Sequence, residues 1–252
     1  MKLLTILSSA FLFVGCVQDA PGASGQAFGR DVPPAEAPGT EPGTEEPPPP
    51  EPPPVAPPPT YVLGIDHIYM PLVPGSTWSY AGDEDGLPRR EEVSVLDEPS
   101  LILGVMCTAV EEQVFVDGDL VERTTHSYAQ DSDGNVWKFA EESIEYEDGV
   151  PTASEDSWEA GVDGALPWIV FSAAPQVGDV FLSDGGIDAA TVLAVDAMAT
   201  VPAGVFQACL DVAETNAEDP EDTDRILYAP SVGLVSEVSP TGRIQLVSHG
   251  VR

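Results

Sequence analysis

Tight-turn residues recur at short intervals from position 61 onward and limit this part of the chain to short elements. Each turn separates two apolar or alternating runs, and the turns lie at 117–118, 131–135, 148–149, 201–204 and 241–242. Turns of this kind join antiparallel strands. No window has the sustained apolar repeat of an amphipathic helix.

The sequence therefore predicts an all-β fold, an antiparallel meander with few short helices. A half-barrel, a barrel and a sandwich all satisfy the pattern, because each of them buries one face of an antiparallel sheet. Residues 61–252 are enough for one acidic β domain with a sizeable core.

The N-terminus has the pattern of an export signal. Met1-Lys2 supplies one positive charge, and an apolar run continues as far as Val14. About 12 apolar residues would rise only ~18 Å as a helix, less than the ~30 Å hydrocarbon core of a membrane. A cleaved signal explains this segment better than a permanent membrane span does.

Residues Phe13-Val14-Gly15-Cys16 resemble the lipobox of bacterial lipoproteins, in which a small residue precedes a cysteine that receives diacylglycerol. The resemblance implies that the signal peptide, residues 1–15, is removed and that Cys16 carries two or three acyl chains of the palmitate type. Such an anchor is stable, because each buried CH₂ contributes about 0.8 kcal/mol. An ordinary secretory signal with an incidental cysteine is the alternative.

Residues 16–60 are predicted to be the lipidated cysteine followed by a disordered, proline-rich stalk. From Val17 to Thr60 aromatic and branched apolar residues are almost absent, so the segment cannot bury a core. Its stretch Pro47–Pro59 favours polyproline II and would span about 40 Å as a stiff spacer. We favour a spacer over a ligand for an SH3-like domain.

The chain carries 43 acidic and 9 basic residues, a formal net charge of −34. Nucleic acid and anionic membrane surfaces repel a domain with this charge, so we expect no nucleic-acid partner. We favour solubility as the reason for the charge. Binding of cations or of a basic partner is the alternative.

Two cysteines remain in the domain once Cys16 is assigned to lipid. Cys107 and Cys209 each lie in an apolar stretch, and an exported chain is oxidised by default. A disulfide between them would close a loop worth about 4–5 kcal/mol in the chain-entropy model. Two buried free thiols are the alternative.

Asp131, Asp133 and Asn135, with Glu142 further on, place oxygen atoms at four of the positions that a calcium loop uses. However, Val136 stands where such a loop needs glycine, and the residues after it have strand character. We favour a hairpin turn, because Asp, Asn and Gly accept turn geometry. Calcium remains the alternative, and no other cofactor is indicated.

Trp158, Trp168 and Phe171 lie among glycines, prolines and small residues. Aromatic side chains on such a loop can line the mouth of a ligand site, and these three are the candidate ligand-binding residues. The alternative, which we favour, is a long connection that plugs the open end of the β core with its own side chains.

The sequence indicates no catalytic set. His67, His126 and His249 have none of the spacings of a zinc or hydrolytic site. The chain also lacks a G-x-S-x-G nucleophile elbow, a P-loop and a G-x-G-x-x-G turn after a strand. A catalytic site would therefore have to be assembled wholly by the fold.

Several separated motifs resemble a family of secreted bacterial β-rich proteins and lipoproteins of unassigned function. The motifs, in chain order, are YMPLVPGSTWSY at 69–80, DSDGNVWKF at 131–139, SWEAGVDGA at 157–165, VPAGVF at 201–206 and YAPSVGLV at 228–235, in which Ser231 stands where glycine is expected. The resemblance implies a β-rich extracytoplasmic domain and brings no catalytic residue with it.

These observations predict a membrane-anchored, extracytoplasmic lipoprotein that is not an enzyme and binds a ligand or protein partner in the cell envelope. The main alternative is a structural or interaction lipoprotein with a filled core and an acidic surface, on which calcium could assist. A hydrolase is the least favoured. We expect the lipid anchor in the cell membrane or outer membrane. The residue after Cys16 is Val17 and not the aspartate that retains many lipoproteins in an inner membrane, so the outer membrane is favoured.

Overall fold

A computed structural model describes residues 59–154, 156–183, 188–217 and 223–251. These residues form strands and turns, which confirms the all-β prediction; the few short helices that the sequence allowed are not found among them. No helix in these ranges could cross a membrane. The predicted signal peptide, Cys16 and nearly all of the stalk lie outside the described residues.

The strands in chain order are β1 (Tyr61–Val62), β2 (Ile65–His67), β3 (Met70–Leu72), β4 (Ser76–Glu84), β5 (Leu87–Val95), β6 (Ser100–Ile102), β7 (Val105–Val116), β8 (Asp119–Asp131), β9 (Val136–Glu147), β10 (Val150–Ala153), β11 (Trp158–Glu159), β12 (Trp168–Phe171), β13 (Val180–Ser183), β14 (Asp188–Val201), β15 (Gly204–Asn216), β16 (Thr223–Ala229), β17 (Gly233–Val238) and β18 (Gly242–Val251).

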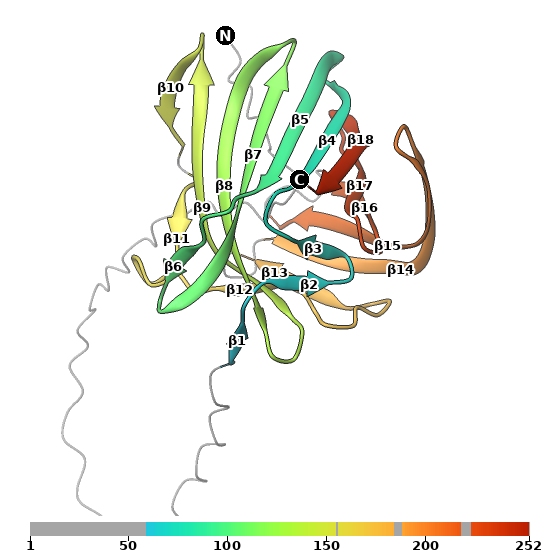
Figure 1. Cartoon of the computed structure of the whole chain (residues 1–252). Coiled ribbons are helices and arrows are strands. Elements are labelled where there is room, and N and C mark those ends of the chain that lie inside the picture. The colour runs from blue at the N-terminus through green and yellow to red at the C-terminus, as the bar shows by residue number, and fades with distance from the viewer. Residues whose placement is uncertain (1–58, 155, 184–187, 218–222, 252) are drawn as a thin grey trace, which may run out of the picture. The chain divides into compact units, whose positions relative to one another are not determined.

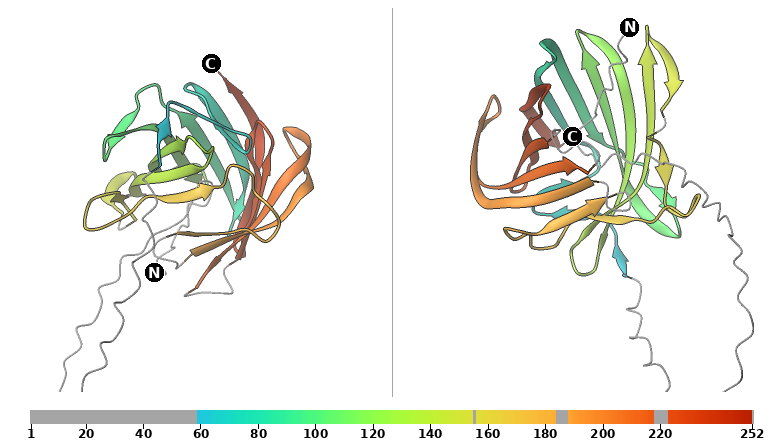
Figure 2. Two further views of the ribbon diagram at one scale, coloured as in Figure 1. Left: turned by 90° about the horizontal axis from the view of Figure 1, so that it is seen from below. Right: turned by 180° about the vertical axis from the view of Figure 1, so that it is seen from behind.

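One large antiparallel sheet contains most of these strands. Its order is β10-β9-β8-β7-β5-β4-β18-β17-β16-β15-β14-β13, with β1, β6, β11 and β12 pairing beside this path. Figures 1 and 2 show that the sheet curves strongly around its interior. The two end strands of the path, β10 and β13, are not paired with each other, so the sheet remains an open, half-barrel-like meander.

Tight turns fix the hairpins of this meander. Asp117 and Gly118 both have positive φ (50° and 94°), and so do Asp148 and Gly149 (53° and 75°). A two-residue turn of this kind matches the right-handed twist of the strands that it joins. All five turns expected from the sequence join neighbouring strands.

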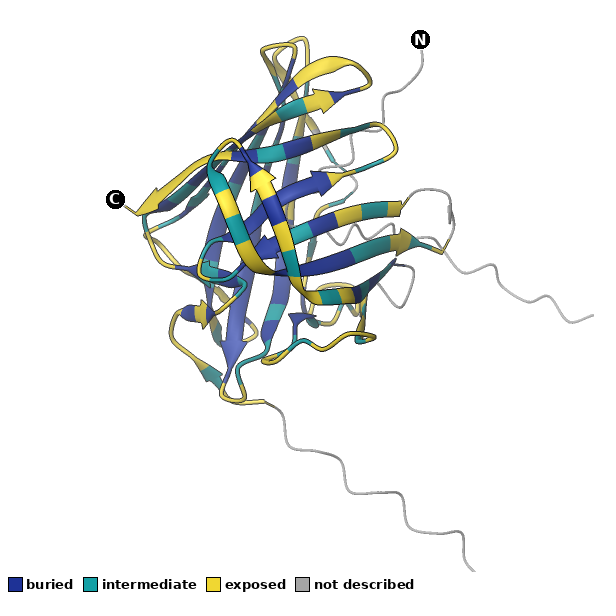
Figure 3. Ribbon diagram, turned by 90° about the vertical axis from the view of Figure 1, so that its right-hand side faces the viewer, coloured by how far each residue is buried: buried dark blue, intermediate teal, exposed yellow. Residues whose placement is uncertain are grey.

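Burial alternates along the strands, because successive side chains point to opposite faces of the sheet. Figure 3 shows this alternation as bands of buried and exposed residues. The main apolar cluster lies inside the curve of the sheet and includes Tyr80, Leu210, Ile226 and Leu246, each at 0% exposure. A smaller cluster around Cys107 and Phe139 lies under β6 and β11.

Strands β4 and β18 join the two halves of the sheet, and glycine stands on each of them. A Cβ atom at Gly82 would overlap the backbone oxygen of Arg243, and one at Gly242 would overlap the backbone oxygen of Asp83. The two glycines therefore permit the close approach of β4 and β18.

We predict that Gly82→Ala lowers the free energy of unfolding by about 2 kcal/mol, because the methyl group must displace the backbone of β18. Gly250→Ala is the matched control: it lies on β18 with no atom within 4 Å of its added Cβ and should stay within about 0.5 kcal/mol of the wild type. Urea denaturation measures both, and equal stability of the two variants would contradict the prediction.

Candidate functional site

A layer of ionisable and hydroxyl side chains lies on the buried face of β5, β7, β8 and β9. These residues alternate with outward-facing ones, so they share this face with the apolar core. We call this set the polar layer; each member is at most 7% exposed, and the members are Arg89, Glu91, Glu112, Glu122, Thr124, His126, Lys138, Glu141 and Ser143.

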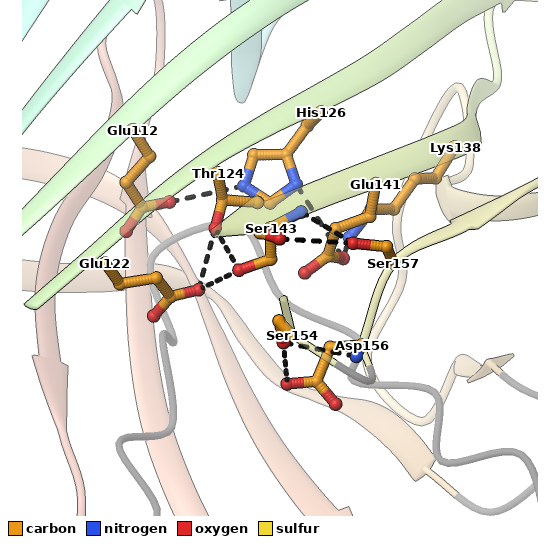
Figure 4. A network of polar contacts seen from close by, with 10 residues as sticks. All are labelled: Glu112, Glu122, Thr124, His126, Lys138, Glu141, Ser143, Ser154, Asp156 and Ser157. Carbon is orange, nitrogen blue, oxygen red and sulfur yellow. Dashed lines mark hydrogen bonds and ion pairs between the residues drawn. The ribbon is translucent and has the colours of Figure 1, made fainter. Parts of the chain in front are cut away.

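His126 lies between two carboxylates at the centre of the polar layer (Figure 4). Its Nε2 is 3.3 Å from Glu112 Oε2, and its Nδ1 is 3.8 Å from Glu141 Oε2. Lys138 Nζ donates to the same Glu141 oxygen at 2.5 Å. Burial and the positive charge of Lys138 lower the pKa of His126 to about 3. The imidazole is therefore neutral at physiological pH, and Lys138 is the charged partner of Glu141.

Glu122 is held by hydroxyl groups. Its Oε1 accepts hydrogen bonds from Thr124 Oγ1 at 2.7 Å and from Ser143 Oγ at 2.8 Å. The backbone N–H of Ser143 in turn donates to Ser157 Oγ at 2.9 Å. Burial raises the pKa of Glu122 to about 7, although the two hydroxyl donors oppose the shift. The Glu122 carboxyl is thus poised between its two protonation states near neutral pH.

Arg89 is the second cation of the polar layer. Its Nη1 donates to Glu84 Oε2 at 2.9 Å, and its Nη2 lies 2.5 Å from Glu91 Oε1. Burial raises the pKa of Glu91 in spite of this ion pair. Carboxylates therefore outnumber cations in the polar layer, and burial favours the protonated form of at least Glu91 and Glu122.

The polar layer brings a histidine and carboxylates together, which the sequence spacing did not indicate. A hydrolytic site needs such groups in a cleft that substrate can enter. Here His126 and Glu112 are completely buried, and Glu141 is 3% exposed. The arrangement therefore acts as an internal framework. The other histidines lie elsewhere: His67 on β2, with Nε2 3.0 Å from the backbone oxygen of Ser172, and His249 exposed on β18.

The structure stacks the two candidate tryptophans on each other. The rings of Trp158 and Trp168 have centroids 4.1 Å apart and planes inclined by 24°. Trp158 on β11 pairs with Glu141, and Trp168 on β12 pairs with Lys138, so both lie beside strand β9, next to members of the polar layer.

Phe171, the third candidate, belongs to the main apolar cluster. It is 6% exposed, and its ring lies 5.2 Å from that of His67 and 5.0 Å, edge to face, from that of Tyr228. The structure thus brings Trp158 and Trp168 together and places Phe171 in the core.

The candidate calcium residues form the β8–β9 turn. Asp131 Oδ1 accepts the backbone N–H groups of Asp133 (3.0 Å) and Asn135 (2.9 Å). Its Oδ2 accepts Asn135 Nδ2 and Trp137 Nε1, both at 2.8 Å. Donors of the chain itself therefore occupy both oxygens of Asp131. Within the described ranges no group of three or more His, Cys, Asp or Glu could hold a metal ion.

Cys107 and Cys209 are both free and buried, so the predicted disulfide is not formed in this structure. They belong to different apolar clusters, on strands β7 and β15, which are not neighbours in the sheet. Burial raises the pKa of Cys107 to about 12, which keeps that thiol protonated and unreactive. The structure therefore contains two buried free thiols, which was the alternative to the disulfide.

An open groove of about 620 Å³ lies between the β1–β3 region and the β8–β9 turn. Val62, Leu63 and Val73 give it an apolar rim and are 41%, 86% and 49% exposed. Asp66 and Gln130 supply polar groups, joined by a hydrogen bond of 2.7 Å from Gln130 Nε2 to Asp66 Oδ1. The volume is in the range of small-molecule sites.

A second, much smaller cavity of about 20 Å³ lies inside the main apolar cluster. Its wall includes Tyr128, Phe171, Phe181, Tyr228 and Glu214. By volume it has room for about one water-sized group. Of these two concavities, the open groove is the larger.

Comparisons with known proteins do not assign the chain to a family. No family model matches it, and no curated protein matches it. The chain is similar to a solved structure from Parabacteroides distasonis that is provisionally described as a lipoprotein, with 14% identity, coverage of 73% of this chain and 99% of that one, and a TM-score of 0.41. A similarity at this level carries no inference about the function of this chain.

We predict that protonation of Glu122 makes the stability of the domain depend on pH. The folded-state pKa of about 7 lies above the ordinary value of 4.5, so the stabilisation is complete below pH 4.5 and is lost as the pH rises through 7. The loss from this one group is about 3 kcal/mol. Glu122→Gln should remove that part of the pH dependence in urea denaturation.

The matched control for this experiment is Glu142→Gln, an exposed glutamate on β9. Its stability should follow that of the wild type at every pH. If Glu122→Gln also reproduced the wild-type pH profile, burial of Glu122 would not have the proposed energetic effect.

Proposed function

We propose that this chain is a membrane-anchored, extracytoplasmic lipoprotein whose β domain binds a ligand or partner of the cell envelope without catalysing a reaction. The observation that carries the proposal is the open groove between β1–β3 and the β8–β9 turn. It is concave, has a volume of about 620 Å³ and combines apolar walls with a few polar groups, as binding sites for small molecules generally do.

The anchor and the tether are proposed from the sequence. Phe13-Val14-Gly15-Cys16 supports acylation of Cys16, and the proline-rich residues after it support an extended stalk. The groove includes Val62 of β1, the first strand after the stalk. A ligand held there would lie at the end of the domain where the tether begins.

The lining of the groove limits the chemistry of its ligand. Leu63, Val73 and the buried Leu72 offer apolar contact, while the charged groups of the lining, Asp66, Asp131 and Asp133, are all acidic. An anionic ligand would be repelled. We therefore propose an apolar ligand that is neutral, or that carries a hydrogen-bond donor.

A structural or interaction lipoprotein is the second candidate, and the small volume of the cavity inside the main apolar cluster, about 20 Å³, is compatible with it. In that case the same groove would hold a segment of a partner protein, and purified protein alone would capture no small apolar molecule. A hydrolase has less support, because His126 and its carboxylate neighbours are buried.

We predict that the protein binds the neutral apolar dye Nile red in the groove. The double variant Leu63→Glu, Val73→Glu places two carboxylates on the apolar rim and should weaken binding at least tenfold, since each substitution makes a charge part of the contact. Leu101→Glu is the matched control, an exposed leucine on β6. A fluorescence titration measures the affinities; equal binding by the double variant would remove the groove assignment.

We predict that Cys16→Ser abolishes membrane attachment, because serine cannot receive the thioether-linked diacylglycerol. Fractionation of producing cells should show the wild-type protein with the membranes and the variant free of them. Mass spectrometry of the wild-type N-terminus should find acyl chains on Cys16. An unmodified Cys16 would contradict the proposed location.

A further inference from the structure

The β6–β7 turn carries an exposed leucine in a strained conformation. Leu103 has a φ of 50° and Gly104 a φ of 80°, so they form the same kind of two-residue turn as Asp117-Gly118 and Asp148-Gly149. The first position of such a turn favours Asn, Asp or Gly, because a bulky side chain meets a steric penalty at positive φ. Leu103 is nevertheless 63% exposed. Neither the geometry of the turn nor burial in the core explains this leucine, and such strain often marks a functional position.

Two more exposed apolar side chains lie on the same hairpin. Leu101 of β6 and Met106 of β7 are paired across the hairpin, and their exposed fractions are 67% and 43%. Ile102, next to Leu101 in the chain, is 4% exposed and belongs to the small apolar cluster. The hairpin therefore buries one face and presents leucine and methionine side chains to the outside.

The loop between β11 and β12 lies against the tip of this hairpin. A Cβ atom at Gly161 would be 2.5 Å from Leu103 Cδ2, so the leucine side chain lies next to the loop. The backbone N–H of Gly161 donates to the backbone oxygen of Ala165 at 2.9 Å. This bond folds the loop back and keeps Val162 and Leu166, 51% and 75% exposed, near Gly161. We call these five exposed side chains the loop patch: Leu101, Leu103, Met106, Val162 and Leu166.

The chain enters the domain beside the loop patch. Tyr61 on β1 packs against the small apolar cluster, to which Ile102 of the hairpin and Ala160 of the loop also belong. Figure 1 shows β1, β6 and β11 toward the same end of the sheet and the β9–β10 turn at the opposite end. An acyl group on Cys16 would therefore be connected to the domain at the end that carries the loop patch.

The charges around the loop patch restrict the surface that it can meet. Glu159 and Asp163 are exposed in the loop, and Asp97 and Glu98 are exposed just before β6. Residues 96–107 and 158–168 contain no lysine or arginine. Anionic lipid headgroups would repel these carboxylates. A zwitterionic lipid surface offers apolar contact without this repulsion.

We propose that the loop patch docks on the zwitterionic lipid surface of the membrane that holds the anchor, with Leu101, Leu103 and Leu166 in contact with lipid. Neighbouring exposed apolar side chains mark interaction sites of this kind. The inference rests on the lipid anchor proposed above and is independent of the ligand proposed for the groove. Residues 17–58 keep the domain near that membrane and so raise the effective concentration of the loop patch at its surface. Contacts too weak to hold the protein alone therefore suffice, and Cys16→Ser is still expected to lose attachment.

Methionine oxidation tests this contact without a label. Met106 belongs to the loop patch, whereas Met198, 63% exposed on β14, lies outside it and is the internal reference. The acylated protein is reconstituted into phosphatidylcholine vesicles, treated with the anionic oxidant chloramine-T and analysed by mass spectrometry. Relative to the Cys16→Ser chain free in solution, Met106 should be oxidised about threefold more slowly, because lipid contact reduces its exposure to the oxidant. Met198 should be oxidised at the same rate in both samples.

Leu103→Asp gives the β6–β7 turn the residue found in the other Asp-Gly turns, so its urea midpoint should equal or exceed that of the wild type. Its charge should nevertheless remove the protection of Met106 on vesicles, and Leu101→Glu should do the same. Each variant is compared with its own Cys16→Ser form. Val150→Glu is the matched control: Val150 is 61% exposed on β10, at the opposite end of the sheet, so the variant should keep Met106 protected.

Flotation of the vesicles and mass spectrometry of the N-terminus separate failure of docking from failure of the anchor. If acylated protein floats with the vesicles but Met106 is oxidised as fast as in solution, docking is overturned and the anchor stands. If the protein carries no acyl chain, the anchor is overturned and docking with it. Protection of Met106 that persists in folded Leu103→Asp and Leu101→Glu, or that grows with protein concentration without vesicles because a second copy covers the loop patch, would also overturn docking.

Discussion

The cost of burying ionisable groups governs this domain. A charged carboxylate inside a protein must be paired, hydrogen-bonded or protonated. The polar layer uses all three solutions: Lys138 and Arg89 pair with Glu141 and Glu84, two hydroxyl groups donate hydrogen bonds to Glu122, and burial favours the protonated form of Glu91. Two of these contacts join neighbouring strands, Arg89 on β5 with Glu84 on β4 and Ser143 on β9 with Glu122 on β8, so they favour the observed alignment of those strands.

Burial also distinguishes the ionisable residues that support the fold from residues that could meet a ligand. A histidine between carboxylates would suggest catalysis in an open cleft, but complete burial makes His126 part of the support for β7, β8 and β9. The open groove with its apolar rim, on which the proposed function rests, lies outside the polar layer.

Local features of the fold could be predicted from the sequence, and long-range ones could not. The pairs Asp117-Gly118 and Asp148-Gly149 indicated hairpins, because an Asp-Gly pair favours the positive φ angles that a two-residue turn needs. The pairing of β4 with β18 joins residues far apart in the chain, and no local pattern encodes it. Ser231, in a motif position where glycine is expected, has a φ of 62°, a conformation that glycine adopts without strain.

The sequence predicted the residues of the candidate sites less completely than it predicted the fold. Trp158 and Trp168 were candidates as aromatic residues on a glycine-rich segment, and the structure stacks their rings on each other. Glu214, Phe181 and Tyr228 gave no signal, because single residues on three strands meet only after folding. The alternation of Glu122, Thr124 and His126 with outward residues on β8 was the available signal for the polar layer, and the high acidic content of the chain obscured it.

Infrared spectroscopy of the carboxyl groups tests most directly the claim that the inner face holds protonated glutamates near neutral pH. At about pH 6, where exposed carboxyl groups are ionised, the folded protein should show an absorption band of protonated carboxyl groups that disappears on unfolding at the same pH. A folded protein without that band would have every buried carboxylate ionised, which would contradict the account of the polar layer.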